Sequence, residues 1–182
     1  MVYPDKAKKI VAFTLFLCLS PPVNYAQESF NAPTPTEVKV AYLVNFARYI
    51  RWPASAFADS SAPIIIALED SHPLAKSLNN ITAARTADGR DIVFQTFSSM
   101  PDLRQIHILY VGDDSRIFRE INKLNIVNPI LTVGDAATFI ESGGIIRLAE
   151  EDDRIIFYVS RDMAENVGLN IHYKVLEMAR ND

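Results

Sequence analysis

The sequence predicts an α/β fold: a single layered domain with a mainly parallel sheet, flanked by helices, and an antiparallel hairpin near the C-terminus. Short, continuous apolar runs alternate with helical patterns along the chain, and such runs are typical of strands buried on both faces of a parallel sheet. Near the C-terminus the alternation of strands and helices stops. One apolar run follows Gly143-Gly144, and the acidic run 150–153 separates it from a second apolar run; two such runs joined by a turn predict an antiparallel hairpin. The alternation indicates layers of helix on sheet.

The first predicted helix includes the sequence KVAYLVNFARYIRWP, residues 39–53, and is apolar on nearly every side. Thr34 is its expected N-cap, Pro35 fits the first helical position, and Glu37 completes a capping box. Pro53 is expected to end it, because the residue before a proline is pushed away from helical angles. A helix that is apolar all round needs a deep core or a partner.

The later elements follow in order. The predicted strands are residues 64–68, 92–97, 106–111, 130–133, 145–149 and 154–160. The predicted helices are residues 73–81, residues 115–124, a short segment through Phe139, residues 162–167 and residues 172–180. Asp88-Gly89 predicts a turn, and the last helix is expected to use Val175, Leu176 and Met178 for its apolar contacts.

The start of the chain has the pattern of an export signal. Three lysines within residues 6–9 form a basic region, residues 10–19 form an apolar core, and VNYA ends at Ala26 as the expected cleavage site. The apolar core is about half the length of roughly 20 residues that a bilayer requires, which favours a cleaved signal over a permanent anchor. The mature protein is therefore expected in the periplasm.

Composition narrows the class of partner. Removing the expected signal peptide, residues 1–26, takes away three of 18 basic and one of 22 acidic residues and leaves a net charge of −6. Nucleic acid and anionic membrane surfaces are bound chiefly by basic clusters, so neither is the expected partner. Cys18 leaves with the signal, so no disulfide is expected. Residues 27–35 are predicted to be a flexible leader, and residues 36–182 one domain.

Acidic residues follow three predicted strands, at the edge where parallel sheets usually bind ligands. They are Asp70, Asp113, Asp114 and Asp135. They could form a polar pocket or a cation site, but Asp is a leading N-cap residue, so capping of the next helix is the favoured interpretation. No Walker loop or GxGxxG fingerprint is present to bind phosphate.

Little else in the sequence points to chemistry. His72, His107 and His172 have no partner at zinc spacing, and no GxSxG elbow is present. His107 is expected inside a strand; His72, which precedes Pro73, is the one histidine for which a pocket role is a credible alternative, though not the favoured one. We therefore expect no catalytic residue, no metal and no cofactor. One rival is a periplasmic solute-binding module that uses Asp70, His72 and Asp113; an uncharacterised hydrolase is a weaker one.

Five aromatic residues in or just after the first helix are the predicted partner-binding residues. They are Tyr42, Phe46, Tyr49, Trp52 and Phe57. Aromatic side chains are frequent anchors of protein interfaces. The alternative is that they cover the open end of the core, and an all-round apolar helix fits either interpretation.

Four segments together resemble the YfiR family of small exported proteins. They are residues 39–53, ILTVGD at 130–135, FIESGGIIRL at 139–148, and residues 154–180. The resemblance spans nearly the whole mature chain, in the same order. The helix ending in WP, the Gly-Gly-Ile hairpin and the closing GL-I-x-x-x-x-L-x-x-A pattern make it specific as a set.

The resemblance implies a periplasmic regulator without enzymatic activity. YfiR-like proteins repress an inner-membrane diguanylate cyclase by binding its periplasmic sensor region, and an OmpA-like outer-membrane lipoprotein sequesters them. Release raises cyclic-di-GMP and favours biofilm formation. A homodimer is left open by the sequence. Because this mature chain has no cysteine, disulfide-dependent control does not carry over from the family.

Overall fold

The computed structural model describes residues 32–78, 85–112, 116–123 and 129–180. The expected signal peptide and Asp113 and Asp114 lie outside the described residues. The predicted leader is described only from residue 32 onward.

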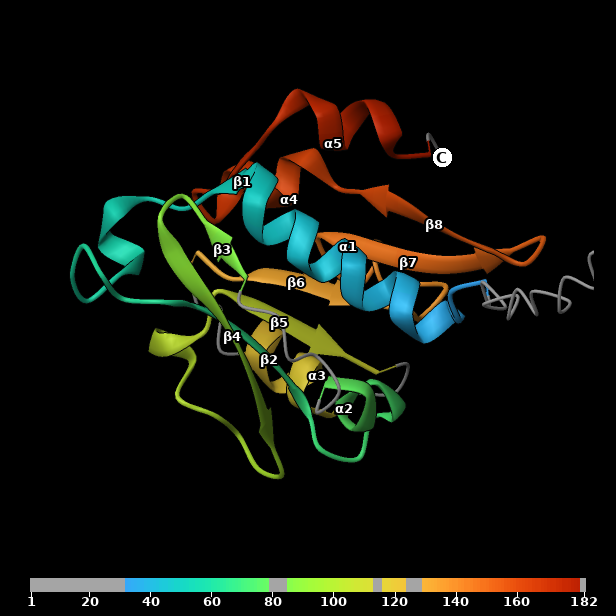
Figure 1. The fold of residues 1–182 in the computed structure, drawn as a ribbon, viewed down its shortest axis with the longest axis horizontal. Coiled ribbons are helices and arrows are strands. Elements are labelled where there is room, and N and C mark those ends of the chain that lie inside the picture. Colours follow the sequence, from blue (N-terminus) through green and yellow to red (C-terminus); the bar gives the residue numbers. More distant parts are fainter. Residues whose placement is uncertain (1–31, 79–84, 113–115, 124–128, 181–182) are drawn as a thin grey trace, which may run out of the picture. The chain divides into compact units, whose positions relative to one another are not determined.

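Within the described residues, seven strands form one sheet in the order β3-β4-β2-β5-β6-β7-β8 (Figure 1). The parallel neighbours are β4 (Arg90–Phe97), β2 (Ile64–Glu69), β5 (Ile108–Val111), β6 (Leu131–Gly134) and β7 (Ile146–Glu151). Two antiparallel strands complete the edges, β3 (Thr86–Ala87) beside β4 and β8 (Arg154–Val159) beside β7. The predicted α/β fold class is confirmed.

Helices cover both faces of this sheet, as the alternation of buried side chains along its strands shows. In β2, Ile66 belongs to one hydrophobic cluster and Ala67 to the other; in β5, Tyr110 and Leu109 divide in the same way. Successive side chains of a strand point to opposite faces. The first cluster is shared with α1 (Pro35–Tyr49), α2 (Pro73–Leu78), α4 (Arg161–Asn166) and α5 (Tyr173–Met178), and the second with α3 (Arg116–Lys123).

Helix α1 begins as predicted. The Glu37 amide donates to Thr34 Oγ1 at 3.3 Å, and the Thr34 amide donates to Glu37 Oε2 at 2.8 Å, so the capping box is closed. Hydrogen bonds from the Thr34 backbone and side chain lower the pKa of the Glu37 carboxyl. Pro35 occupies the first turn.

The end of α1 differs from the prediction. The helix stops at Tyr49 and not next to Pro53, because Ile50 and Arg51 form a short strand, β1 (Ile50–Arg51), that pairs antiparallel with β9 (Asn170–Ile171). Ile50 is buried at this junction. A long-range strand pair therefore sets the boundary before the proline can. A single turn of 3₁₀ helix follows at Ala54–Ala56, and another lies at Leu103–Gln105.

Two local predictions need correction. The segment through Phe139 forms turns and not a short helix. The chain bends there because the Phe139 ring packs beside both Gly134 and Gly144. The acidic turn of the hairpin is also narrower than expected: the acidic residues at 150 and 151 continue β7, and the turn is Asp152-Asp153, where φ is 48° and 59°.

The Asp88-Gly89 turn is confirmed. Its residues have φ values of 55° and 77° and join β3 to β4, which matches the two-residue hairpin turn that such a pair favours. Strand β3 itself was not predicted. Helix α2 is described to Leu78, and the rest of its predicted length lies outside the described residues.

Candidate functional site

The first two predicted partner-binding residues fasten α1 to the sheet. Phe46 is 1% exposed, and its ring meets that of Phe157 edge to face at 5.4 Å between centroids. Tyr42 is half-buried and lies 5.9 Å from Phe46 and 5.2 Å from Phe157, again between ring centroids. Its hydroxyl donates to the carbonyl of Ile155 at 3.2 Å. Phe46 is therefore a core residue that does not reach the surface.

Trp52 and Phe57 gather around His107. The Phe57 ring stacks on the imidazole with 4.6 Å between centroids, and the Trp52 ring meets the imidazole edge to face at 6.1 Å. The Arg90 guanidinium lies over the Phe57 ring, 3.7 Å from its centroid. Arg90 also donates to the carbonyl of Ala62 at 2.6 Å. Both aromatic residues are half-buried and pack against the core. This arrangement covers the N-terminal ends of the strands.

His107 is a buried residue just before β5, with 4% of its surface exposed. Its Nδ1 accepts a hydrogen bond from the Ile65 amide at 3.2 Å, so in the neutral ring the proton is on Nε2. Burial lowers the pKa of His107. The carbonyl of Ala56 opposes that shift, the charge of Arg90 adds to it, and the carbonyl of Gln105 opposes it again.

This shift predicts a loss of stability in weak acid. The unfolded imidazole titrates near pH 6.5, whereas the folded one resists protonation, so the unfolded state binds more protons as pH falls. The contribution of the neutral, buried His107 to the free energy of unfolding is therefore complete above about pH 6.5 and decreases below it. We expect the melting temperature of wild type to fall between about pH 7 and 5 by more than that of His107→Asn, whose amide oxygen retains an acceptor for Ile65. Equal pH profiles for the two proteins would contradict the assignment.

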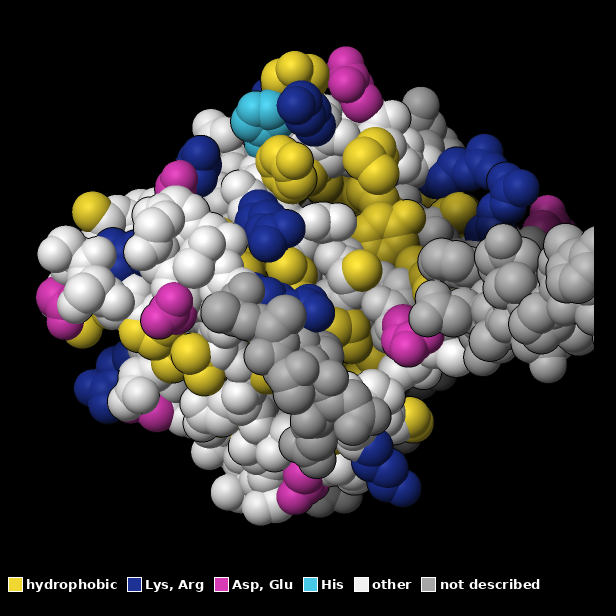
Figure 2. All heavy atoms as spheres, in the orientation of Figure 1, with side chains coloured by type: hydrophobic (Ala, Val, Ile, Leu, Met, Phe, Trp, Pro, Cys, Tyr) yellow, Lys and Arg dark blue, Asp and Glu magenta, His cyan; other side chains and the backbone are white. Residues whose placement is uncertain are grey.

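Tyr49 lies on a different surface, where α1 meets α5. The His172 amide donates to the Tyr49 carbonyl at 3.0 Å, and the rings of these two residues lie 5.9 Å apart. The ring of Tyr173 follows, 4.5 Å from that of His172. Tyr49, Tyr173 and Met178 are 39%, 58% and 66% exposed, and we call these three residues the α1–α5 surface. Figure 2 shows hydrophobic side chains gathered over these two helices and between them.

Sequence reasoning missed two members of this surface. Met178 was expected to make apolar contacts for the last helix, but it is among the exposed large hydrophobic residues, and Val175 is the buried one. Tyr173 was not selected. The sequence signal was that α5 carries more apolar residues than one buried face requires. The pairing of β1 with β9 brings the start of α5 to the end of α1, which no local pattern predicts.

A polar pocket of about 390 Å³ lies where β2, β5 and β6 end, as expected for a parallel sheet. Lys39 donates to Asp135 Oδ2 at 2.9 Å, and the Tyr110 hydroxyl donates to the same oxygen at 2.6 Å. The ring of His72 meets that of Tyr110 edge to face at 4.8 Å. We call this cavity the strand-end pocket. Its lining is Pro35, Thr36, Lys39, His72, Pro73, Leu74, Gly112, Asp135 and Glu150.

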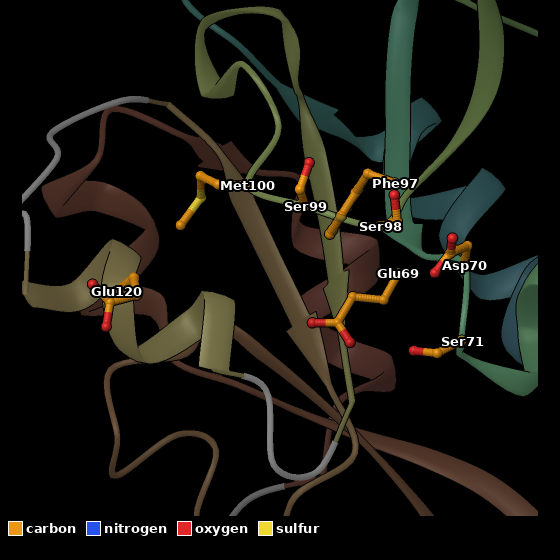
Figure 3. A pocket seen from close by; sticks show the side chains of 8 residues that line it. All are labelled: Glu69, Asp70, Ser71, Phe97, Ser98, Ser99, Met100 and Glu120. Atoms are coloured by element: carbon orange, nitrogen blue, oxygen red, sulfur yellow. The ribbon is translucent and has the colours of Figure 1, made fainter.

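The predicted strand-end acids Asp135 and Asp70 line two different pockets. Asp135 does not cap a helix, because turns follow it; it joins α1 to the sheet through Lys39. Asp70 is exposed and lines another pocket, of about 370 Å³, together with Glu69 and Glu120. Figure 3 shows the Glu69 carboxylate reaching into this second pocket from the end of β2, with Glu120 on the opposite side. Among the described residues, no group of three or more His, Cys, Asp or Glu could hold a metal ion.

The comparison with protein families decides the class of the chain. Residues 36–180 match the model of the family described as YfiR/HmsC-like. The chain belongs to the YfiR/HmsC-like family. A search among curated proteins finds no match. In the described part of this YfiR/HmsC-like chain, no helix combines the length and the apolar character needed to cross a bilayer.

The structure explains three glycines in the segments that resemble the YfiR family. A Cβ on Gly134 would lie 2.6 Å from Phe139 Cε2, and one on Gly144 would overlap the ring and lie 2.7 Å from the Phe139 carbonyl oxygen. Gly143 has a φ of 93°, which a side chain rarely permits. In this YfiR/HmsC-like chain, the ILTVGD and FIESGG segments therefore build one packing unit around Phe139.

Proposed function

We propose that this protein is a periplasmic regulator that represses an inner-membrane diguanylate cyclase by binding the periplasmic sensor region of the cyclase. Its family supports the regulatory role. The basic and apolar pattern of residues 1–26, with cleavage near Ala26, supports export to the periplasm. Repression would keep cyclic-di-GMP low and restrain biofilm formation. The proposal assigns binding and no catalysis to this chain.

The α1–α5 surface is the observation that carries the binding role. Tyr49 on α1 and Tyr173 and Met178 on α5 are large apolar side chains that remain exposed. Exposed apolar patches with aromatic anchors are typical of protein interfaces. We place Tyr49 at the contact, together with Tyr42, which lies seven residues earlier on the same helix.

The other predicted partner-binding residues take different places in this proposal. Phe46 supports Tyr42 from the core and makes no direct contact, because it is buried. Trp52 and Phe57 are partly exposed but pack on His107, on a different surface from Tyr49, so we assign them no direct contact with the partner.

The mechanism is a binding equilibrium. A repressor that has higher affinity for the inactive cyclase than for the active one shifts the population towards the inactive state. A second partner that binds the repressor, such as an OmpA-like outer-membrane lipoprotein, would release the cyclase by mass action. Repression and release then need only competition for one surface.

The test uses the mature chain, residues 27–182, as bait for membranes of the source organism. Wild type is expected to retain a diguanylate cyclase, and Tyr49→Ala combined with Tyr173→Ala is expected to lose it. Against the purified sensor region, the double variant should bind roughly 30-fold more weakly or worse, since a hot spot is worth about 2 kcal/mol or more. Calorimetry would give both affinities.

The matched control is Met100→Ala. Met100 is 43% exposed, close to the exposure of Tyr49, but it follows β4 and lines the second pocket. Its substitution should leave the affinity unchanged. If the double variant keeps wild-type affinity while folded, the interface is elsewhere; if no cyclase is retained by wild type, the proposed function fails.

A further inference from the structure

We propose that the strand-end pocket binds a small solute through a primary ammonium group, with Asp135 as the acceptor. The proposal is independent of the cyclase interaction. It concerns a pocket at the N-terminal half of α1, whereas the α1–α5 surface includes the residue at the C-terminal end of that helix.

The first argument is the bonding of the Asp135 carboxylate. Oδ2 accepts hydrogen bonds from Lys39 and Tyr110, so two donors converge on one oxygen. Oδ1 is buried and has no hydrogen-bond partner in the described part of the chain. A buried acceptor without a donor is costly, and a charged one more so. The carboxylate therefore keeps unused acceptor capacity at the pocket wall, and displacement of the Lys39 side chain would open it to a ligand with several N–H donors.

The second argument is the chemistry of the pocket wall. The charged residues that line it are Lys39, Asp135 and Glu150, so one positive and two negative side chains give an excess of negative charge. Pro35 and Pro73, which are both exposed, add apolar surface for a short hydrocarbon chain. A volume of about 390 Å³ is within the usual range for small-molecule sites. This combination fits an aliphatic amine better than an anion.

The third argument is that the pocket already accommodates an ammonium group. Lys39 Nζ lies 2.9 Å from Asp135 Oδ2, and the two side chains are 18% and 20% exposed. Lysine is a point charge on a flexible stem and can move aside when another ammonium replaces it. Ligand binding is therefore an exchange: the ammonium of the solute takes the carboxylate, and the Lys39 ammonium moves towards water.

Calorimetric titration of the exported protein tests this. The probes are putrescine and succinate, which have the same four-carbon length and opposite charge. We expect saturable binding of one putrescine per chain and no binding of succinate. Asp135→Asn should weaken putrescine binding roughly ten- to hundredfold, since the ammonium group loses its charged acceptor. Lys39→Met should strengthen it, because the competing ammonium is gone.

Asp70→Asn is the matched control. It removes an exposed carboxylate at the end of a neighbouring strand, in the other pocket, and should leave the affinity for putrescine unchanged. Circular dichroism checks that each variant is folded. If Asp135→Asn does not fold, the affinity of Lys39→Met for putrescine provides the test. Absence of saturable putrescine binding, binding of succinate instead, or an equal loss in Asp70→Asn would each overturn the proposal.

Discussion

Replacing Phe46 by alanine is expected to lower the free energy of unfolding by about 3–5 kcal/mol, the usual cost of deleting a buried aromatic ring. Phe46 is 1% exposed, and its ring contacts those of Tyr42 and Phe157, so its removal leaves a cavity between α1 and β8. Urea denaturation followed by circular dichroism would measure the change.

Tyr49→Ala is the control for this prediction, because it removes a ring from the same helix three residues later. Tyr49 is 39% exposed, so its substitution should change stability by about 1 kcal/mol or less. Comparing the two variants distinguishes a residue that stabilises the fold from one that is available to contact a partner. Equal losses for the two variants would mean that the Tyr49 ring is part of the core.

Gly144→Ala is expected to lower the free energy of unfolding by about 3 kcal/mol, at the upper end of the usual cost of overpacking. The added methyl group would overlap the ring of Phe139 and crowd its carbonyl oxygen, and this backbone atom cannot rotate away as a side chain does. Gly134 also lies against the Phe139 ring, which limits how far the ring can shift. The same denaturation experiment measures the effect.

Gly112→Ala is the matched substitution at a site with space. Its Cβ would lie 3.5 Å from His72 Cδ2, an ordinary contact, so stability should change by about 0.5 kcal/mol or less. Adding Phe139→Leu to Gly144→Ala should recover part of the loss, because the smaller side chain relieves the overlap. A simple sum of the two single effects would show that the ring is not the cause.

Local signals predicted much of the fold. The capping box of α1, the apolar runs of β2, β5 and β6, and the turn at Asp88-Gly89 all depend on residues a few positions apart. Such short-range rules are readable from sequence because the interacting groups are neighbours in the chain. The end of α1 was mispredicted because strand β9, more than 100 positions later, determines it.

The candidate sites were harder to predict, since each joins distant segments. Asp135 was selected as a strand-end acid, but its bond to Lys39 connects residues 96 positions apart. His107 was expected inside a strand but lies just before β5, and its cover by Trp52 and Phe57 was not predicted. A helical wheel places Phe46 and Tyr49 on one stripe, and no periodicity reveals that only the second remains exposed.

The sequence by itself determined the α/β class, most strands, the start of the first helix and the resemblance to a family of regulators. These depend on residue type and spacing. The tertiary structure alone decided which aromatic residues are core and which are surface, and which charged residues meet in a pocket. The physical reason is that burial and ion pairing depend on what packs against a side chain, and that neighbour comes from elsewhere in the chain.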